Sequence, residues 1–129
     1  MEEVVGFTGT QEGMSYEQTN ALRQALIGAT ELHHGDCIGA DAQAHDIARE
    51  IGGIRIVIHP PTDPSRRAFK RGDIIREPKP YLERNHDIVD ESASLIAAPK
   101  SDVEELRSGT WATVRYARKM EKPVKMLLR

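Results

Sequence analysis

The chain has 129 residues, of which 29% are charged and 5% are aromatic, and its formal net charge is −2. This length predicts one domain, residues 1–129, with a core of mainly aliphatic side chains. The charge argues against a highly basic nucleic-acid-binding protein. The single cysteine, Cys37, excludes an internal disulfide and favours a reducing compartment. We find no apolar run long enough to span a membrane and no secretion leader, so we expect a cytoplasmic protein.

Apolar runs and turn residues in the first half predict alternating strands and helices. A first strand is expected at 4–8. Ser15 then predicts a helix start, because Gln18 follows three residues later as in a capping box. A short second strand is expected at 31–34. The next helix has an apolar stripe typical of a helix lying on a sheet, formed by Ala40, Ala44, Ile47, Ala48 and Ile51.

The second half continues this alternation. Further strands are expected at 54–59, 92–99 and 123–128, and helices at 81–91 and 110–120. The segment 59–81 holds five of the seven prolines, which predicts an irregular loop that is either functional or disordered. The order predicts an α/β protein with a Rossmann-like, doubly wound, mostly parallel sheet of about five strands and helices on both faces. Ligands bind such sheets beyond the carboxyl ends of the strands.

The loop after the first strand, "GFTGTQEGMS", has glycines and hydroxyl groups before a helix. Gly9, Thr10 and Gly13 lie in it. Its backbone N–H groups and the helix N-terminus could hold a phosphate. The alternative is a turn that needs glycine for its backbone angles.

The stretch "HHGDCIGADAQAH" links the second strand to the second helix. Gly35 and Gly39 permit a tight turn and a close backbone approach. Asp41 falls in the first turn of the helix, where it would either stabilise the helix start or accept hydrogen bonds from ligand hydroxyls.

The same stretch contains His33, His34 and His45. Their spacing matches no standard zinc pattern, so we predict neither a metal nor a resident cofactor. His45 could instead bond back to Asp41, which lies four residues earlier on the same helix face.

Two further segments suit an anion. In "SRRAFKR", cations surround an aromatic residue, which favours a mobile flap over a phosphate or a single strand above a merely solvated loop. Its candidate residues are Arg66, Arg67, Phe69 and Lys70. Arg84 is expected on the third helix. Ser108, Gly109 and Thr110 precede or begin the fourth helix, where they would bind an anion or only cap the helix.

Taken in order, these segments resemble the SLOG superfamily, which groups Smf/DprA-type DNA-processing proteins with LOG-type phosphoribohydrolases. "VVGFTGTQEGMSYEQ" and "HGDCIGADAQAH" resemble the first and second motifs of the DNA-processing proteins. "RNHDIVDESASLIAAP" followed by "SGTWATV" resembles the LOG-type arrangement of an arginine helix, an apolar strand and a glycine–threonine loop.

The resemblance implies a Rossmann-like fold that binds nucleotides or nucleotide-derived ligands, often as a homodimer. It implies a pocket lined by Gly9, Thr10, Gly35, Asp41, Gly109 and Thr110, with Arg84 contacting phosphate and assisting catalysis. LOG-type hydrolases carry a glutamate three residues after the motif threonine, where this chain has Thr113. Because glycosidic hydrolysis needs a carboxylate, Asp41 and Glu12 are the candidates to replace it.

These observations give three hypotheses. The first is binding of a nucleotide or a phosphorylated nucleotide derivative, with its phosphate on the 9–13 and 108–110 loops and Asp41 on the ribose. The second is N-glycosidic hydrolysis of nucleoside monophosphates. The third is single-stranded DNA binding by the 65–71 segment, against which the net charge of −2 argues.

Overall fold

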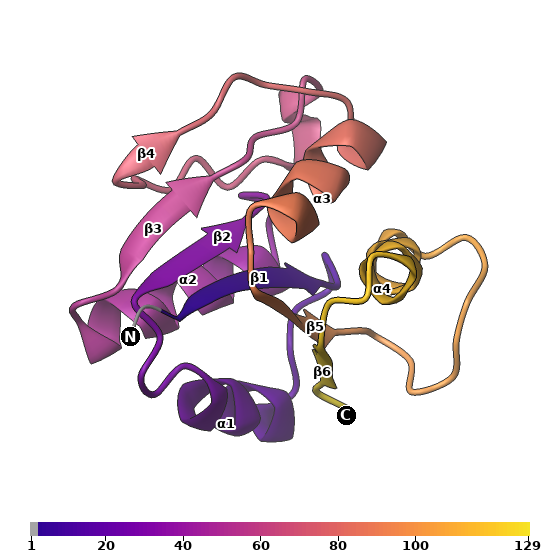
Figure 1. Ribbon diagram of the computed structural model, residues 1–129, viewed down its shortest axis with the longest axis horizontal. Coiled ribbons are helices and arrows are strands. Elements are labelled where there is room, and N and C mark those ends of the chain that lie inside the picture. The colour runs from indigo at the N-terminus through magenta and orange to yellow at the C-terminus, as the bar shows by residue number, and fades with distance from the viewer. Residues whose placement is uncertain (1–2) are drawn as a thin grey trace.

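Short apolar runs form the strands of a parallel sheet in the computed structural model, which describes residues 3–129 (Figure 1). The sheet has six strands in the order β4-β3-β2-β1-β5-β6, and each neighbouring pair is parallel. The strands are β1 (Val4–Gly9), β2 (Glu31–His34), β3 (Arg55–Ile58), β4 (Ile74–Ile75), β5 (Ser94–Ala98) and β6 (Val124–Met126). The helices are α1 (Tyr16–Ala25), α2 (Ala40–Ile51), η1 (a 3-10 turn, Pro64–Arg66), α3 (Tyr81–Asp90) and α4 (Gly109–Lys119).

The predicted fold class, a Rossmann-like α/β sheet with helices on both faces, is confirmed, but the count of about five strands is wrong. The additional strand is β4, which pairs with the end of β3 inside the proline-bearing segment 59–81. It has only two residues and lies at the sheet edge, where Ile75 is half exposed. A strand this short has no alternating pattern from which it could be predicted.

Alternation along β5 shows how the two layers of helices share one sheet. Ile96 and Ala98 belong to the core beneath α1 and α2, whereas Leu95 and Ala97 belong to the core beneath α3 and α4. This follows from the two-residue period of a strand, which sends neighbouring side chains to opposite faces. Figure 1 shows the same division, with α1 and α2 on one side of the sheet and α3 and α4 on the other.

Strand β1 lies at the topological switch point. The chain continues from β1 to β2 and β3 on one side, and the later strands β5 and β6 add on its other side. In open parallel sheets the helices leave a crevice at the carboxyl ends of the strands beside such a reversal. The end of β1 at Gly9 is therefore the place where the fold predicts a ligand site. In the described part of the chain, no helix is long and apolar enough to cross a membrane.

Candidate functional site

A cleft of about 660 Å³ opens beyond the carboxyl end of β1. Its walls come from the end of β1, the turn after β2, η1, α3 and the loop before α4. The predicted site residues that line it are Gly9, Thr10, Asp41, Arg66, Arg84, Ser108, Gly109 and Thr110. The predicted residues outside this lining are Glu12, Gly13, Gly35, Gly39, Arg67, Phe69 and Lys70.

Arg84 is a buried cation in the wall of this cleft, with 5% of its surface exposed. Its Nη1 donates to the carbonyl oxygens of Gly35 (2.5 Å) and His59 (3.1 Å), which follow β2 and β3. A Cβ at Gly35 would collide with the guanidinium, so glycine is needed there for this close approach. The Nε atom of Arg84 is buried and has no hydrogen-bond partner among residues 3–129.

No ion pair within residues 3–129 includes Arg84. A buried guanidinium without a carboxylate in direct contact is costly, because carbonyl groups replace only part of its hydration. An anionic ligand in the cleft would add a direct counter-charge to this guanidinium.

Asp41 is a buried acidic residue of the cleft wall, in the first turn of α2. It is 6% exposed, and its Oδ2 accepts a hydrogen bond from the Cys37 backbone N–H at 3.2 Å. Burial raises the pKa of Asp41 to about 6, although the Arg84 charge opposes the shift. The carboxylate is therefore mostly ionised at neutral pH and becomes protonated in mildly acidic solution.

The loop after β1 is fixed against the start of α2. The Thr10 carbonyl accepts from the Ala40 N–H at 2.9 Å, and the Thr10 hydroxyl accepts from the Glu12 N–H at 3.1 Å. Gly39 has a φ of +86°, and a Cβ there would overlap the backbone of Gln11. Gly39 thus allows two loops to pack together, which is a structural contribution to the cleft. The Glu12 side chain is exposed and pairs with Lys100.

The N-terminus of α4 faces the cleft from the opposite wall. Ser108 caps this helix by accepting from the Trp111 N–H at 3.2 Å. Gly109 is exposed, and a Cβ added to it would have no atom within 4 Å. The unbonded N–H groups and the dipole of a helix start favour an anion at this position. Thr113, which stands where LOG-type hydrolases carry a glutamate, is buried and donates its hydroxyl hydrogen to the Gly109 carbonyl. This position therefore supplies no carboxylate to the cleft.

Carboxylates bind Arg67 and Lys70 of the 65–71 segment, for which the sequence predicts a mobile flap. Asp36 is fully buried and accepts from Arg67 Nε at 2.8 Å and from the Lys70 backbone N–H at 3.0 Å. Lys70 Nζ pairs with Asp46, and the Arg67 guanidinium stacks on the Phe69 ring at 4.7 Å. Arg67 and Lys70 thus form their contacts outside the cleft. Of the predicted flap residues, Arg66 alone is among the residues that line the cleft.

The histidines of the "HHGDCIGADAQAH" stretch belong to two separate buried pairs. His34 Nε2 lies 3.0 Å from His45 Nδ1, so His45 bonds to His34 and the expected bond to Asp41 is replaced. His33 Nδ1 lies 2.8 Å from His59 Nε2, and His59 comes from outside the "HHGDCIGADAQAH" stretch. Burial is the main cause that lowers the pKa of His59 to about 3.

Several lining residues were not predicted from the sequence. They include Asp63, Asn85, Lys100, Glu105 and Arg107. The last three lie in the loop between β5 and α4, which the rule for ligand sites in parallel sheets already selects. Asn85 follows Arg84 directly and could have been inferred from that neighbour. Asp63 lies in the long loop, whose path depends on tertiary contacts.

The fold and the cleft together define a Rossmann-like α/β protein with a ligand-sized crevice at its switch point. No protein-family model matches the chain, and no curated protein sequence matches it. Among solved structures, the molybdenum cofactor binding protein from Rippkaea orientalis is similar, with a TM-score of 0.73 and 22% identity over 98% of this chain and 76% of that chain.

Two other solved structures have the same fold. The Moco carrier protein from Chlamydomonas reinhardtii has a TM-score of 0.73 and 23% identity, over 98% of this chain and 76% of that chain. A protein designated TM1055 has a TM-score of 0.69 and 15% identity, over 96% of this chain and 72% of that chain. At these identities the similarity establishes the fold alone.

Proposed function

We propose that this chain is a SLOG-type domain that binds a nucleotide, or a phosphorylated nucleotide-derived small molecule, in the cleft beyond β1. The observation that carries the proposal is Arg84, a buried cation in the cleft wall with an unpartnered Nε–H and no ion pair within residues 3–129. The start of α4 in the opposite wall adds backbone N–H donors. A phosphate between these two groups would satisfy both.

The rest of the cleft suits the remaining parts of such a ligand. The Asp41 carboxylate accepts hydrogen bonds from ribose hydroxyls, and Thr10 lies beside the phosphate position at the end of β1. A volume of about 660 Å³ is within the usual range for small-molecule sites. Two solved structures with this fold are a molybdenum cofactor binding protein and a Moco carrier protein, which supports a small molecule as the ligand class. The homodimer and the cytosolic location remain predictions from the sequence.

The test is a binding titration with the purified wild-type chain and its Gly109→Val variant. We expect wild type to bind at least one member of a panel of nucleotides and the molybdenum cofactor, measured by calorimetry and native mass spectrometry. Gly109→Val should abolish binding, because its branched side chain would fill the approach to the helix N-terminus. The variant should fold, since no atom lies within 4 Å of a Cβ at this position.

Tyr16→Val is the matched control. Tyr16 is likewise the first residue of a serine-capped helix, is 77% exposed, and does not line the cleft. This variant should bind as wild type does. Unchanged affinity in a folded Gly109→Val protein would show that the ligand site is elsewhere.

A second candidate function is N-glycosidic hydrolysis of nucleoside monophosphates. It is favoured by Asp41, a carboxylate in the cleft wall whose pKa is raised by burial, as is common for catalytic acids and bases. Chromatography of wild-type reactions with each nucleotide would reveal free base, and Asp41→Asn should stop its release. Binding without release of base from any nucleotide would leave the binding function alone.

A further inference from the structure

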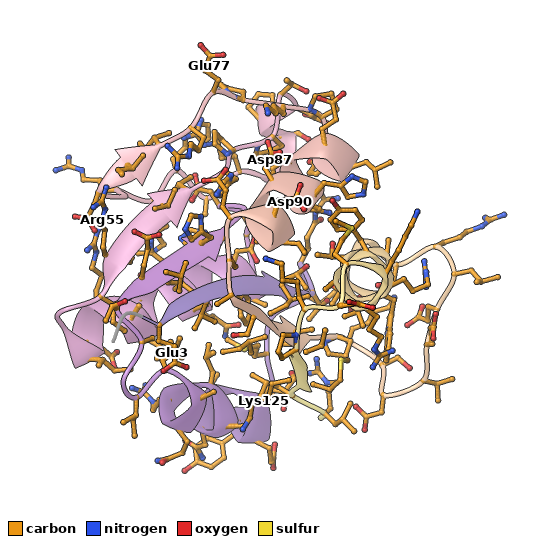
Figure 2. All side chains as sticks on the ribbon, viewed as in Figure 1. Glu3, Arg55, Glu77, Asp87, Asp90 and Lys125 are labelled. Carbon is orange, nitrogen blue, oxygen red and sulfur yellow. The ribbon has the colours of Figure 1, made fainter. Side chains whose placement is uncertain are left out.

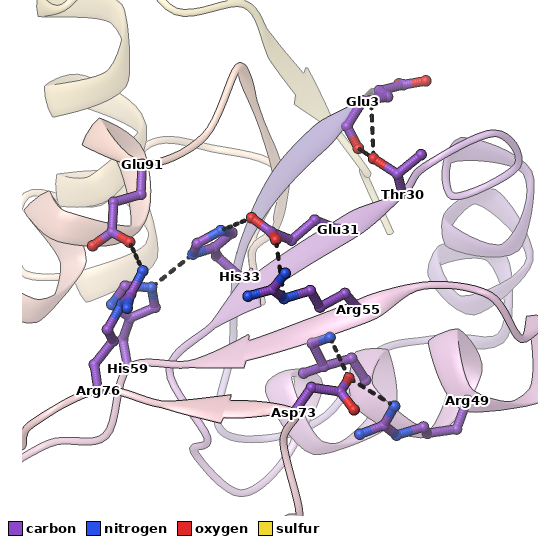
Figure 3. Close-up of polar contacts among 11 residues, drawn as sticks. Glu3, Thr30, Glu31, His33, Arg49, Arg55, His59, Asp73, Arg76 and Glu91 are labelled. Atoms are coloured by element: carbon purple, nitrogen blue, oxygen red, sulfur yellow. Dashed lines mark hydrogen bonds and ion pairs between the residues drawn. The ribbon is translucent and has the colours of Figure 1, made fainter. Parts of the chain in front are cut away.

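The buried pair of His33 and His59 lies apart from the cleft, between β2 and the end of β3. The two residues are 1% and 2% exposed. His33 Nδ1 is 2.8 Å from His59 Nε2, and the other ring nitrogen of His33, Nε2, is 2.7 Å from Glu31 Oε2 (Figure 3). Both nitrogens of the His33 ring therefore have a defined partner.

The carboxylate of Glu31 decides which nitrogen of His33 carries the hydrogen. An ionised carboxylate only accepts hydrogen bonds, so His33 Nε2 must be the N–H donor to it. Its Nδ1 is then a lone pair that faces His59. A carboxylate behind one imidazole nitrogen and a lone pair at the other is the arrangement by which proteins orient metal-binding histidines.

Glu91, next after the last residue of α3, brings a second carboxylate to this pair. One ligand atom each from His33, His59 and Glu91 lie within 4.8 Å of one another. Glu91 is partly exposed, which gives the buried imidazoles an opening to solvent. In Figure 3 the Arg76 side chain reaches the same place, and its Nη2 lies 2.6 Å from Glu91 Oε1.

We propose that His33, His59 and Glu91 form a binding site for a divalent transition-metal ion such as Zn²⁺ or Co²⁺, with Glu31 orienting His33. Two imidazoles and one carboxylate are a common protein donor set for these ions, and they leave a coordination position for water. The site does not depend on what the cleft binds.

Metal binding requires three local changes. The hydrogen on His59 Nε2 moves to Nδ1 by exchange with solvent, so the imidazole stays neutral and its Nε2 lone pair turns to the ion. The two facing nitrogens, now 2.8 Å apart, separate to roughly 3.3 Å, the spacing set by two metal–nitrogen bonds of about 2.0 Å in a tetrahedral site. The Arg76 side chain, which is 46% exposed, leaves Glu91 for solvent.

The pair of His34 and His45 provides an internal comparison. Its facing nitrogens are 3.0 Å apart, and both residues are buried. The second nitrogen of His34, Nδ1, accepts from the Asp36 backbone N–H. Within residues 3–129, the grouping of possible metal ligands consists of His33, His59 and Glu91 and includes neither His34 nor His45. A histidine pair that shares no such grouping with a carboxylate should therefore bind metal far more weakly.

The experiment is a titration of untagged, chelator-treated protein with Co²⁺, followed by its visible absorption, with Zn²⁺ added as a competitor. Wild type should form a 1:1 complex whose spectrum shows nitrogen and oxygen ligands, and Zn²⁺ should displace the Co²⁺. Glu91→Gln should bind at least about tenfold more weakly, and His59→Asn should lose the spectrum. Arg76→Gln should bind more tightly, since a competing cation is removed. His45→Asn should bind as wild type does.

Glu91→Gln keeps the test decisive even if His59→Asn does not fold, because Glu91 lies at the surface. Absence of a complex in wild type would overturn the proposal. So would a Glu91→Gln protein with wild-type affinity, or an equal loss in His45→Asn.

Discussion

Asp41 has both a structural and a chemical position in the cleft. Its Oδ2 fixes the turn after β2 by accepting from the Cys37 N–H, while the residue also forms part of the cleft wall. Its pKa of about 6 lies above the ordinary value of 3.8 because burial disfavours the ionised form. The folded protein therefore binds this proton more tightly than the unfolded chain does.

The linkage predicts how Asp41→Asn changes stability with pH. The stabilising effect of the protonated carboxyl is complete below about pH 4 and is lost as the pH rises through 6. A shift from 3.8 to about 6 corresponds to about 3 kcal/mol at 1.36 kcal/mol per pH unit. Relative to Asp41→Asn, wild type should lose this amount of unfolding free energy between pH 3 and pH 7.

Urea unfolding of both proteins at intervals across this pH range measures the difference. Glu77→Gln is the control, because Glu77 points into solvent (Figure 2) and is exposed. Parallel pH profiles of wild type and Asp41→Asn would contradict the assigned pKa.

Among the elements, α1 shows how one polar side chain can fix a helix to the rest of the fold. Ser15 and Gln18 form the predicted capping box, which is confirmed. Gln18 is also fully buried, and its Nε2 donates to the carbonyls of Pro99 and Leu127 at 2.9 and 2.8 Å. One amide thus joins the helix start to the ends of two distant segments.

Replacing Gln18 with alanine should lower the unfolding free energy by about 3 kcal/mol. The reason is that two buried carbonyls and the Ser15 N–H would lose their partner at once, and each such loss costs about 1–3 kcal/mol before relaxation. Gln24→Ala, at an exposed position of the same helix, should change stability by less than about 0.5 kcal/mol. Chemical denaturation of the two variants measures both values, and equal effects would contradict this role of Gln18.

Local signals explain which elements could be predicted. The capping box lies within four consecutive residues, and the apolar stripe of α2 lies within one helix, so neighbouring residues suffice to identify them. The strand β4 at Ile74–Ile75 depends on pairing with Val57 and Ile58, which no local pattern reveals. The engagement of Arg67 by Asp36 likewise depends on a contact across 31 residues.

The candidate site was predictable to the extent that it follows from topology. Gly9 and Gly109 lie next to strand or helix ends, and the parallel order brings such ends to one edge of the sheet. The burial of Arg84 without a direct ion pair within residues 3–129 could not be predicted, because it depends on which carboxylates the folded chain brings near. The pairing of His33 with His59 required the register of β2 against β3.

The whole molecule contains two cores, which we expect to unfold cooperatively. The core beneath α1 and α2 and the core beneath α3 and α4 are separated by the same sheet. Polar contacts also link elements within a layer, as where Asp90 projects from α3 toward α4 and accepts from the Tyr116 hydroxyl at 2.7 Å (Figure 2). Because β5 contributes side chains to both cores, neither core can lose this strand without exposing the other core.

We therefore expect Ile56→Val to destabilise both cores equally. Ile56 is fully buried on β3 in the first core, and this change typically costs about 1 kcal/mol. The single tryptophan, Trp111, lies in the second core. The urea midpoint of unfolding followed by Trp111 fluorescence should shift by the same amount as the midpoint followed by far-ultraviolet circular dichroism. A shift in circular dichroism without a shift in fluorescence would mean that the two cores unfold separately.

The position of β1 also has a consequence for the order in which the chain folds during synthesis. On one side β1 pairs with β2, with Val4 opposite Glu31; on the other it pairs with β5, with Val5 opposite Ser94. The first pairing can form once residues 31–34 have left the ribosome, whereas the second must wait for residues 94–98. Until then the central strand has an open hydrogen-bonding edge, the kind of surface that recruits other chains. Nascent chains of this protein should accordingly be most prone to aggregate before β5 is made.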